Sequence, residues 1–298
     1  MSRTPQVAQS DQEMGNTPTP SSQQKKLDWS VLPEDVFKFM EVRTAFNSAA
    51  YLLPTIQTIK ESNPRLTLLD VGAGSGSMSA SFAQIIGPDG HVTAVDVNPV
   101  VIPRAKVVAE KWGVKNISFQ TADAYKMPFE DGTFDIVHCH QVLNHNKNQW
   151  EILREMIRVT KPGGVVAARE GDLETEVMWP PLPGMVKFHY DLEVKLITGR
   201  GGCATSGRQL LSWALRAGAK RGQITTSFGT WTYTEPEDRK LWASGMIGIA
   251  LGPMVRENNI KAGITEAAMD EMREAWAEWM NRDDAVLAQL HGEIIIRK

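Results

Sequence analysis

The segment Leu66–Gly76, with the sequence LTLLDVGAGSG, constrains the fold of this chain more than any other part. A short apolar run that ends in glycines is typical of a buried strand followed by a tight turn. The residues that follow, from Ser77, have the apolar spacing of a helix. Glycine lets the backbone turn sharply and lets a ligand approach the main chain without a Cβ in the way. A strand, such a turn and a helix in this order are the context that a ligand site on an α/β sheet requires.

Strand-like and helix-like segments alternate along the next part of the chain. Apolar runs typical of buried strands occur at 91–97, 116–120, 134–139 and 164–170, and helical patterns separate them at 77–86, 100–112 and 148–159. Two later strands are expected at 223–233 and 292–297. Alternation of this kind favours βαβ units with helices on both faces of a parallel sheet. We therefore predict an α/β protein with a Rossmann-like, doubly wound, mostly parallel seven-stranded sheet and helical cap insertions.

Composition divides the chain into a tail and one domain. Residues 1–28 are rich in Gln, Ser, Thr and Pro, so they cannot bury enough apolar surface to become ordered, and we expect a disordered, dispensable tail. Residues 29–298 are expected to form one domain, with N-terminal lid helices in 29–60. The segments 171–200 and 234–290 interrupt the strand–helix rhythm and are rich in tryptophan and methionine. We interpret them as insertions that cap a substrate site.

Proline and apolar spacing mark the helices outside this alternation. Pro33 suits the first turn of a helix over 34–42, and a second helix from Thr44 is expected to break or kink at Pro54. Residues 172–184 contain several prolines and a glycine, which predicts a loop. Further helices are expected at 185–197, 206–217, 236–249 and 266–281.

The overall composition argues against several classes of protein. A formal net charge of −3 gives no sign of the basic surface that nucleic-acid binding usually needs. Cys139 and Cys203 have neither metal-ligand nor redox-motif spacing, so we expect no metal site and a reducing compartment. No apolar stretch is long enough for a membrane span, and the N-terminus has no signal core. We therefore expect a cytoplasmic protein, and the oligomeric state stays open.

Acidic residues mark the ends of the first three expected strands: Asp70 and Asp96 lie at the ends of the first two, and Asp123 lies just after the third. Open α/β sheets bind ligands outside the carboxyl ends of their strands, so these carboxylates are expected at one site. A dinucleotide pattern would place its third glycine at position 77, which is serine here. Asp70 would sit awkwardly near a pyrophosphate but suits a ligand with a cationic ammonium and sulfonium. Asp96 suits the two hydroxyls of a ribose, and Asp123 suits an adenine amino group.

These motifs resemble the class I S-adenosylmethionine-dependent methyltransferases, and especially their ubiquinone/menaquinone-biosynthesis-type group. The resemblance rests on RTAFNSAAYLLP, LLDVGAGSGSMS, AVDVNP, ADAYKMPFEDGTFDIVHCHQVLNH and LREMIRVTKPGGVVAAREGD, and it covers residues 40–175 well. It implies an enzyme that binds S-adenosylmethionine and releases S-adenosylhomocysteine. The cofactor-binding residues that we predict on these grounds are Arg43, Asp70, Gly72, Ala73, Gly74, Gly76, Asp96, Val97, Asp123, Ala124, His140 and Gln141.

Two side chains at strand ends are candidates for catalysis, His140 and Glu170. His140 is either a base or a residue that shapes the cofactor pocket, and Glu170 either contacts the acceptor or pairs with a neighbouring charge. We expect methyl transfer to a small, apolar or aromatic organic acceptor, as in secondary metabolism, with no nucleic-acid partner. The sequence leaves three alternatives open: a nicotinamide oxidoreductase, a member that keeps the cofactor without methylating, and a methyltransferase for nucleic acid or protein.

Overall fold

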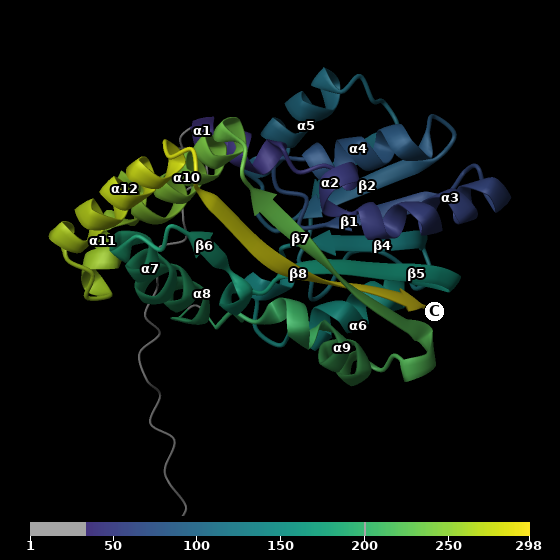
Figure 1. Ribbon diagram of the computed structural model, residues 1–298. Helices are drawn as coiled ribbons and strands as arrows, with labels where there is room; N and C mark the ends of the chain where they lie inside the picture. Colours follow the sequence, from purple (N-terminus) through teal and green to yellow (C-terminus); the bar gives the residue numbers. More distant parts are fainter. Residues whose placement is uncertain (1–33, 200) are drawn as a thin grey trace, which may run out of the picture.

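The computed structural model describes residues 34–199 and 201–298 (Figure 1). The tail predicted for residues 1–28 therefore lies outside the described residues. The described chain forms a central sheet with helices on both faces and a further group of helices at one end (Figure 1). Among these helices, none combines the length and the apolar character needed to cross a bilayer.

The central sheet contains eight strands in the order β3-β2-β1-β4-β5-β8-β6, with β7 also paired to β8. Strands β1 to β5 are parallel, and their bounds are Thr67–Val71, His91–Asp96, Ile117–Thr121, Phe134–His140 and Thr160–Gly171. Strand β8 (Val286–Arg297) is antiparallel to β5 and to β7 (Ile224–Tyr233). Val71 pairs with Val95 in β2 and with Cys139 in β4. The carboxyl ends of these three strands therefore lie side by side.

Strand β6 (Val177–Trp179) is the eighth strand, in a segment where the sequence predicts a loop. It pairs with residues 286–288 of β8. One edge of β8 pairs with β7. The other edge pairs with β5 and, nearer the start of β8, with β6. The expectation of a loop was wrong because a strand of three residues carries too few side chains to show a pattern, and its pairing comes from a distant segment.

Helices cover both faces of the parallel strands. Leu68 packs with the helices of one face and Leu69 with those of the other, and both side chains are fully buried. This burial on both sides is why the parallel strands read as continuous apolar runs. The helices of the first face are α2 (Ala45–Ser48), α3 (Leu53–Ser62) and α4 (Ser77–Ile86), those of the second are α6 (Gln149–Val159) and α9 (Ser206–Ala217), and α5 (Val101–Lys111) packs against α4 and β3.

The remaining helices form a cap at one end of the sheet, around an apolar core of its own (Figure 1). Trp276 and Trp279 belong to this core, and both are almost fully buried. The cap consists of α1 (Glu34–Glu41), α7 (Pro183–Lys187), the π-helix η5 (Phe188–Glu193), α8 (Val194–Gly199), α10 (Pro236–Leu251), α11 (Pro253–Lys261) and α12 (Glu266–Met280).

The helical expectations need four corrections. Pro54 does not end a helix but lies in the first turn of α3, where its missing N–H costs nothing. The helix expected at 185–197 is divided by the π-helix η5, and α11 was not anticipated. Of the predicted lid region, α1 belongs to the cap, whereas α2 and α3 pack against the sheet with α4.

Candidate active site

The glycine-rich turn after β1 is held tightly against its neighbours. Gly72, Gly74 and Gly76 have φ values of 74°, 51° and 83°, a region that glycine adopts without strain. The N–H groups of Gly72 and Ala73 donate to the carbonyl of Val95 in β2, at 2.8 and 2.9 Å. A Cβ at Gly72 would lie 2.3 Å from a methyl group of the loop after β4, and a Cβ at Gly76 would lie 2.7 Å from α5. Contacts with β2, the loop after β4 and α5 therefore fix the position of the turn.

Asp96, at the end of β2, faces this turn. Its Oδ2 accepts a hydrogen bond from the N–H of Gly74 at 3.0 Å, and its Oδ1 accepts one from Asn98 at 2.9 Å. Burial raises the pKa of Asp96, while these backbone donors oppose the shift. Each carboxylate oxygen can accept a second hydrogen bond, so the side chain retains the acceptor capacity that two ribose hydroxyls would use.

Asp70 does not face the site, although the sequence predicts it beside the cationic part of the cofactor. Its side chain is buried, with Oδ2 accepting from the hydroxyl of Ser79 at 2.5 Å and Oδ1 lying 2.8 Å from Nδ1 of His138. Both oxygens are thus engaged inside the fold between β1, β4 and α4. This geometry does not support the expected direct contact of Asp70 with the cofactor, because the carboxylate anchors the strand end from within.

The other predicted cofactor residues on β2 and β3 lie at the surface of the site. Val97 is 64% exposed, which is unusual for a large apolar side chain that follows a buried strand. Asp123 is exposed after β3, and its Oδ1 accepts a hydrogen bond from the N–H of Tyr125 at 2.9 Å. Ala124 is half-buried. These positions leave an exposed strip along the ends of β2 and β3.

Helix α1 lies over the glycine turn. A Cβ at Gly74 would lie 3.2 Å from Cε of Met40, and the hydroxyl of Ser77 donates to the Met40 carbonyl at 3.4 Å. Arg104 of α5 binds α1 through Glu41 at 2.6 Å and through Glu34 at 2.8 Å. The lid function predicted for the N-terminal helices thus has a physical counterpart in α1, which is attached to α5 by an Arg with two partners.

Arg43 lies in the connection between α1 and α2, not within a helix. Its guanidinium carbon is 4.8 Å from the ring centres of both Phe39 and Trp231, within the range of cation–π contacts. Burial lowers the pKa of Arg43 to about 10, so it stays protonated at neutral pH. The segment that follows α1 therefore contacts the ring of Trp231 through Arg43, while Met40 of α1 lies against the glycine turn.

Trp231 on β7 is the centre of a group that we name the Trp231 box, consisting of Arg43, His140, Arg169, Trp231 and His291. The Trp231 ring centre is 5.5 Å from that of His140 and 4.2 Å from that of His291. The Arg169 guanidinium carbon is 5.0 Å from the same ring centre, and Arg169 Nε is 3.2 Å from Glu293. Two guanidinium groups and two imidazoles thus surround one indole.

Several polar atoms in and beside the Trp231 box are buried without a hydrogen-bond partner among the described residues. They are Oη of Tyr51, both ring nitrogens of His140, Nη1 of Arg169, Nε2 of Gln289 and Nε2 of His291. A buried polar group left without a partner costs about 1–3 kcal/mol. So many together indicate a place that is built to receive polar atoms of a ligand.

Gln141 connects this box to the end of β4. A Cβ at Gly171 would lie 3.1 Å from Nε2 of Gln141, 3.3 Å from Oε1 of Gln289 and 3.5 Å from Nε2 of His291. Gln141 has a φ of 55°, and its Oε1 accepts from Nδ2 of Asn144 at 2.9 Å. The side chain of Gln141 is therefore directed toward the same polar region as His291.

Burial keeps His140 neutral. Its pKa is well below the usual range because the ring is desolvated and because Arg169 and Arg43 lie nearby. A neutral imidazole can accept a proton, although a low pKa makes it a weak base at equilibrium. His140 could be predicted from the sequence as a site residue, whereas Trp231 and Arg169 were not predicted there. Their sequence spacing carries no signal, because β4, β5, β7 and β8 bring them together only through strand register.

Glu170 is fully buried and faces the loop after β4 rather than open space. Its Oε1 accepts from the N–H groups of Val142 and Leu143 at 2.9 Å, and its Oε2 accepts from Asn144 at 3.1 Å. Burial raises the pKa of Glu170 to about 7, although these three donors oppose the shift. This geometry corrects the interpretation of Glu170 as an acceptor-contacting carboxylate and indicates a residue that positions the loop carrying Gln141.

We expect Glu170→Gln to lower the free energy of unfolding by about 1–2 kcal/mol, because the new amide group would face one of the three buried N–H donors. Chemical denaturation measures this loss. Glu174→Gln is the matched control, since Glu174 is an exposed partner of Arg208 and its loss should change stability by less than about 0.5 kcal/mol. Unchanged stability with a hundredfold loss of turnover would instead restore a catalytic role for Glu170.

His291 provides a pH test of the Trp231 box. Burial and the neighbouring Arg169 lower the pKa of His291 to about 2. In the unfolded chain the His291 imidazole is protonated below a pH of about 6.5, whereas in the folded chain it stays neutral. The free energy of unfolding therefore falls as the pH falls. Relative to His291→Leu, wild-type protein should lose about 2 kcal/mol of unfolding free energy between pH 7 and pH 5.

Urea denaturation of both proteins at each pH measures this difference. Because both proteins contain Glu170, whose raised pKa makes stability rise as the pH falls, the comparison cancels its contribution. His91→Leu, at the exposed start of β2, is the control and should track the wild type within about 0.5 kcal/mol at both pH values. A constant gap between wild type and His291→Leu would show that His291 is not buried in the neutral form.

The sheet order, the glycine turn after β1 and the carboxylate at the end of β2 define a Rossmann-like α/β protein with its site at the strand ends. Residues 62–193 match a family model described as a methyltransferase domain. The chain is 31% identical, over 244 residues, to an uncharacterized methyltransferase of Schizosaccharomyces pombe, covering 78% of this chain and 84% of that protein.

Two further comparisons agree with this match. The ubiquinone/menaquinone biosynthesis C-methyltransferase UbiE of Pseudomonas putida is 30% identical to this chain over 188 residues. The match covers 62% of this chain and 73% of that enzyme. A crystal structure from Bacillus halodurans, of a protein provisionally named a methyltransferase, has a TM-score of 0.53 at 17% identity and covers 83% of this chain and 98% of that one. At this identity the structural likeness concerns the fold alone.

The chain belongs to the class I S-adenosylmethionine-dependent methyltransferases and is an enzyme of that class. The family predicted from the turn and strand-end motifs is therefore confirmed. The alternative of a nicotinamide oxidoreductase is wrong, as Ser77 in place of a third glycine already indicated.

Proposed function

We propose that this protein transfers the methyl group of S-adenosylmethionine to a small, apolar or aromatic organic acceptor held in the Trp231 box. The observation that carries the proposal is the set of unpartnered buried polar atoms around the Trp231 ring, next to the end of β4. Ligand sites typically combine an apolar or aromatic lining with a few convergent polar groups. The cap helices, with their tryptophans and methionines, supply the lid over such an acceptor, as in secondary metabolism.

The cofactor would lie along the ends of β1, β2 and β3. Gly72 and Gly74 admit its methionine part close to the backbone, and the free acceptor capacity of Asp96 suits its ribose hydroxyls. Val97, exposed at 64%, and Asp123 suit the adenine. The bound cofactor supplies a methyl group on a sulfonium, which reacts by in-line displacement.

The charges of the Trp231 box favour an acceptor with an electron-rich oxygen or an acidic group. Arg43 and Arg169 bring two cations into a buried space, and among the described residues only Glu293 forms an ion pair with either of them. A phenol, enol or carboxylate is stabilised in its anionic form beside two guanidinium groups. Such an anion is the more reactive nucleophile for methyl transfer.

His140 is placed to take a proton from the acceptor when one must leave. Its neutral ring contacts Trp231, and neither nitrogen is engaged by a described residue. The rest of catalysis is alignment, because α1, α10 and the loop after β4 enclose the reacting groups and keep water out. No metal is assigned to this step.

The alternative of a member that binds the cofactor without methylating is tested by the same experiment as the proposal. Calorimetry with S-adenosylmethionine, S-adenosylhomocysteine and NAD would establish cofactor binding. Incubation with isotopically labelled cofactor and a metabolite extract, followed by mass detection, would find a labelled small molecule. Cofactor binding without any labelled product from a broad set of extracts would favour the non-methylating alternative, and labelled nucleic acid or protein would overturn the acceptor class.

A further inference from the structure

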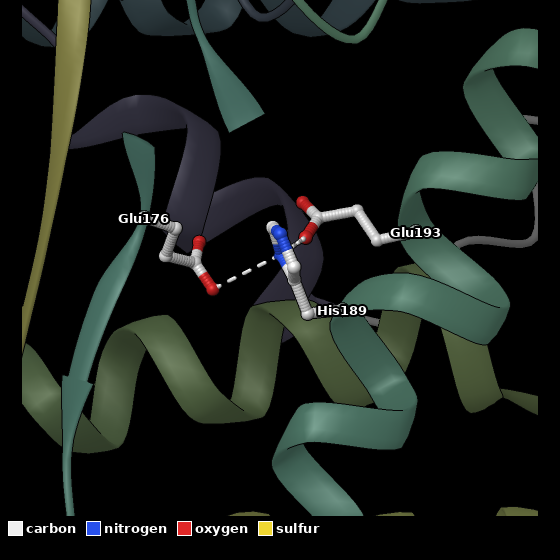
Figure 2. A group of neighbouring side chains, drawn as sticks. All are labelled: Glu176, His189 and Glu193. Carbon is white, nitrogen blue, oxygen red and sulfur yellow. Dashed lines mark ion pairs between the residues drawn. The ribbon is translucent and has the colours of Figure 1, made fainter. Parts of the chain in front are cut away.

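Two carboxylates and one imidazole converge where the cap meets the edge of the sheet. We call Glu176, His189 and Glu193 the Glu–His–Glu cluster. Figure 2 shows the His189 ring between the two carboxylates. Nδ1 of His189 is 3.3 Å from Oε1 of Glu176 and 3.4 Å from Oε2 of Glu193, and one ligand atom of each residue lies within 4.8 Å of the others.

The Glu–His–Glu cluster is buried and its central nitrogen is unsatisfied. The side chains of Glu176, His189 and Glu193 are 4%, 4% and 14% exposed. Nδ1 of His189 makes no hydrogen bond with a described residue, so neither oxygen lies on the line along which the ring would donate. The nitrogen is directed between the carboxylates, toward the point that an ion would occupy.

The backbone supports this convergence. His189 and Glu193 lie on η5, a π-helix inserted between α7 and α8. Single π-turns inside α-helices are rare and are frequent at functional sites. Glu176 immediately precedes β6, so the Glu–His–Glu cluster joins an element of the sheet to an element of the cap.

Charge also favours a cation. In the part of the chain that the structure describes, Glu176 and Glu193 form ion pairs only with His189. When both carboxylates are ionised, they leave a net negative charge even with a protonated ring, and burying an unbalanced charge is costly. A divalent cation with a neutral imidazole brings the sum to zero.

We propose that Glu176, His189 and Glu193 form a binding site for a divalent transition metal of the zinc class, which ties the cap to the sheet edge. Imidazole and carboxylate are ligands that zinc accepts, and ligand atoms at about 2.0–2.2 Å from a tetrahedral ion are about 3.3–3.6 Å apart. The distances from Nδ1 of His189 to the two carboxylate oxygens, 3.3 and 3.4 Å, match this separation between ligand atoms. Three protein ligands leave one coordination position for water. The proposal replaces the expectation of no metal site, and it does not depend on methyl transfer.

The test uses the full chain after treatment with EDTA and dialysis, and Zn²⁺ is the probe. Calorimetry should give one Zn²⁺ per chain, and a hundredfold excess over Kd should raise the Tm by about 5 °C. His189→Ala, Glu176→Gln and Glu193→Gln should each weaken binding at least tenfold and reduce the Tm shift at the same Zn²⁺ concentration to about half or less. The two Gln variants keep the side-chain shape, so they remain informative if His189→Ala does not fold.

Two control variants exclude adventitious binding. His91→Ala removes an exposed imidazole, and Cys203→Ser removes the half-buried thiol. Both should bind Zn²⁺ like the wild type. Absence of saturable one-to-one binding in the wild type, or equal binding by Glu193→Gln, would overturn the proposal and leave the Glu–His–Glu cluster as an imidazolium held by two carboxylates.

Discussion

His140→Ala is expected to lower the rate of methyl transfer by about 10²–10⁴-fold while changing the affinity for S-adenosylhomocysteine by less than about tenfold. The reason is the position of the ring, whose centre lies 5.5 Å from that of Trp231. Neither ring nitrogen has a hydrogen-bond partner among the described residues. Single-turnover kinetics with saturating cofactor separate this effect from binding, which calorimetry measures independently.

The controls distinguish a base from a residue that only fills the pocket. His140→Gln keeps a polar side chain of similar size but cannot take up a proton, so it should be almost as slow as His140→Ala. His91→Ala, on an exposed imidazole, should leave both quantities unchanged. Parallel loss of cofactor affinity and turnover would make His140 a pocket residue, and untouched turnover would mean that the acceptor needs no base.

Asp96→Ala should weaken cofactor binding by about 1.5–3 kcal/mol, or roughly 10- to 150-fold in Kd, as for hydrogen bonds to a charged group. The substitution removes the carboxylate offered to the ribose and also frees the N–H of Gly74, which Asp96 holds at 3.0 Å. The glycine turn would then lose one of its ties to β2. Calorimetric titration with S-adenosylhomocysteine measures the change.

Two further variants make this result specific. Asp96→Asn keeps one oxygen acceptor, so its Kd should lie between those of wild type and Asp96→Ala. Asp89→Ala removes an exposed carboxylate at the loop before β2 and should leave the Kd unchanged. If Asp96→Ala bound the cofactor as tightly as the wild type, the cofactor could not lie along the end of β2.

Much of the cofactor side is local in the sequence and could be predicted from it. The strand, the three glycines and the helix from Ser77 are consecutive, and Asp96 directly ends the next strand, so no long-range contact is needed to recognise them. The direction in which a side chain points cannot be predicted in this way, because it depends on packing. Asp70 ends its strand as expected, yet its carboxylate turns inward to His138 and Ser79, a choice made by α4 and β4 packing around it.

The sequence by itself therefore determined the fold class, the family and the turn that admits the cofactor, because these depend on apolar periodicity and on glycine at neighbouring positions. Only the tertiary structure decided what surrounds the acceptor. Arg43, His140, Arg169, Trp231 and His291 come from five separate segments. They meet because β7 and β8 pair in one register and because the connection between α1 and α2 places Arg43 against Trp231. Register and helix packing are properties of the whole buried core, since a shift of one residue in either strand would turn Trp231 or His291 to the other face.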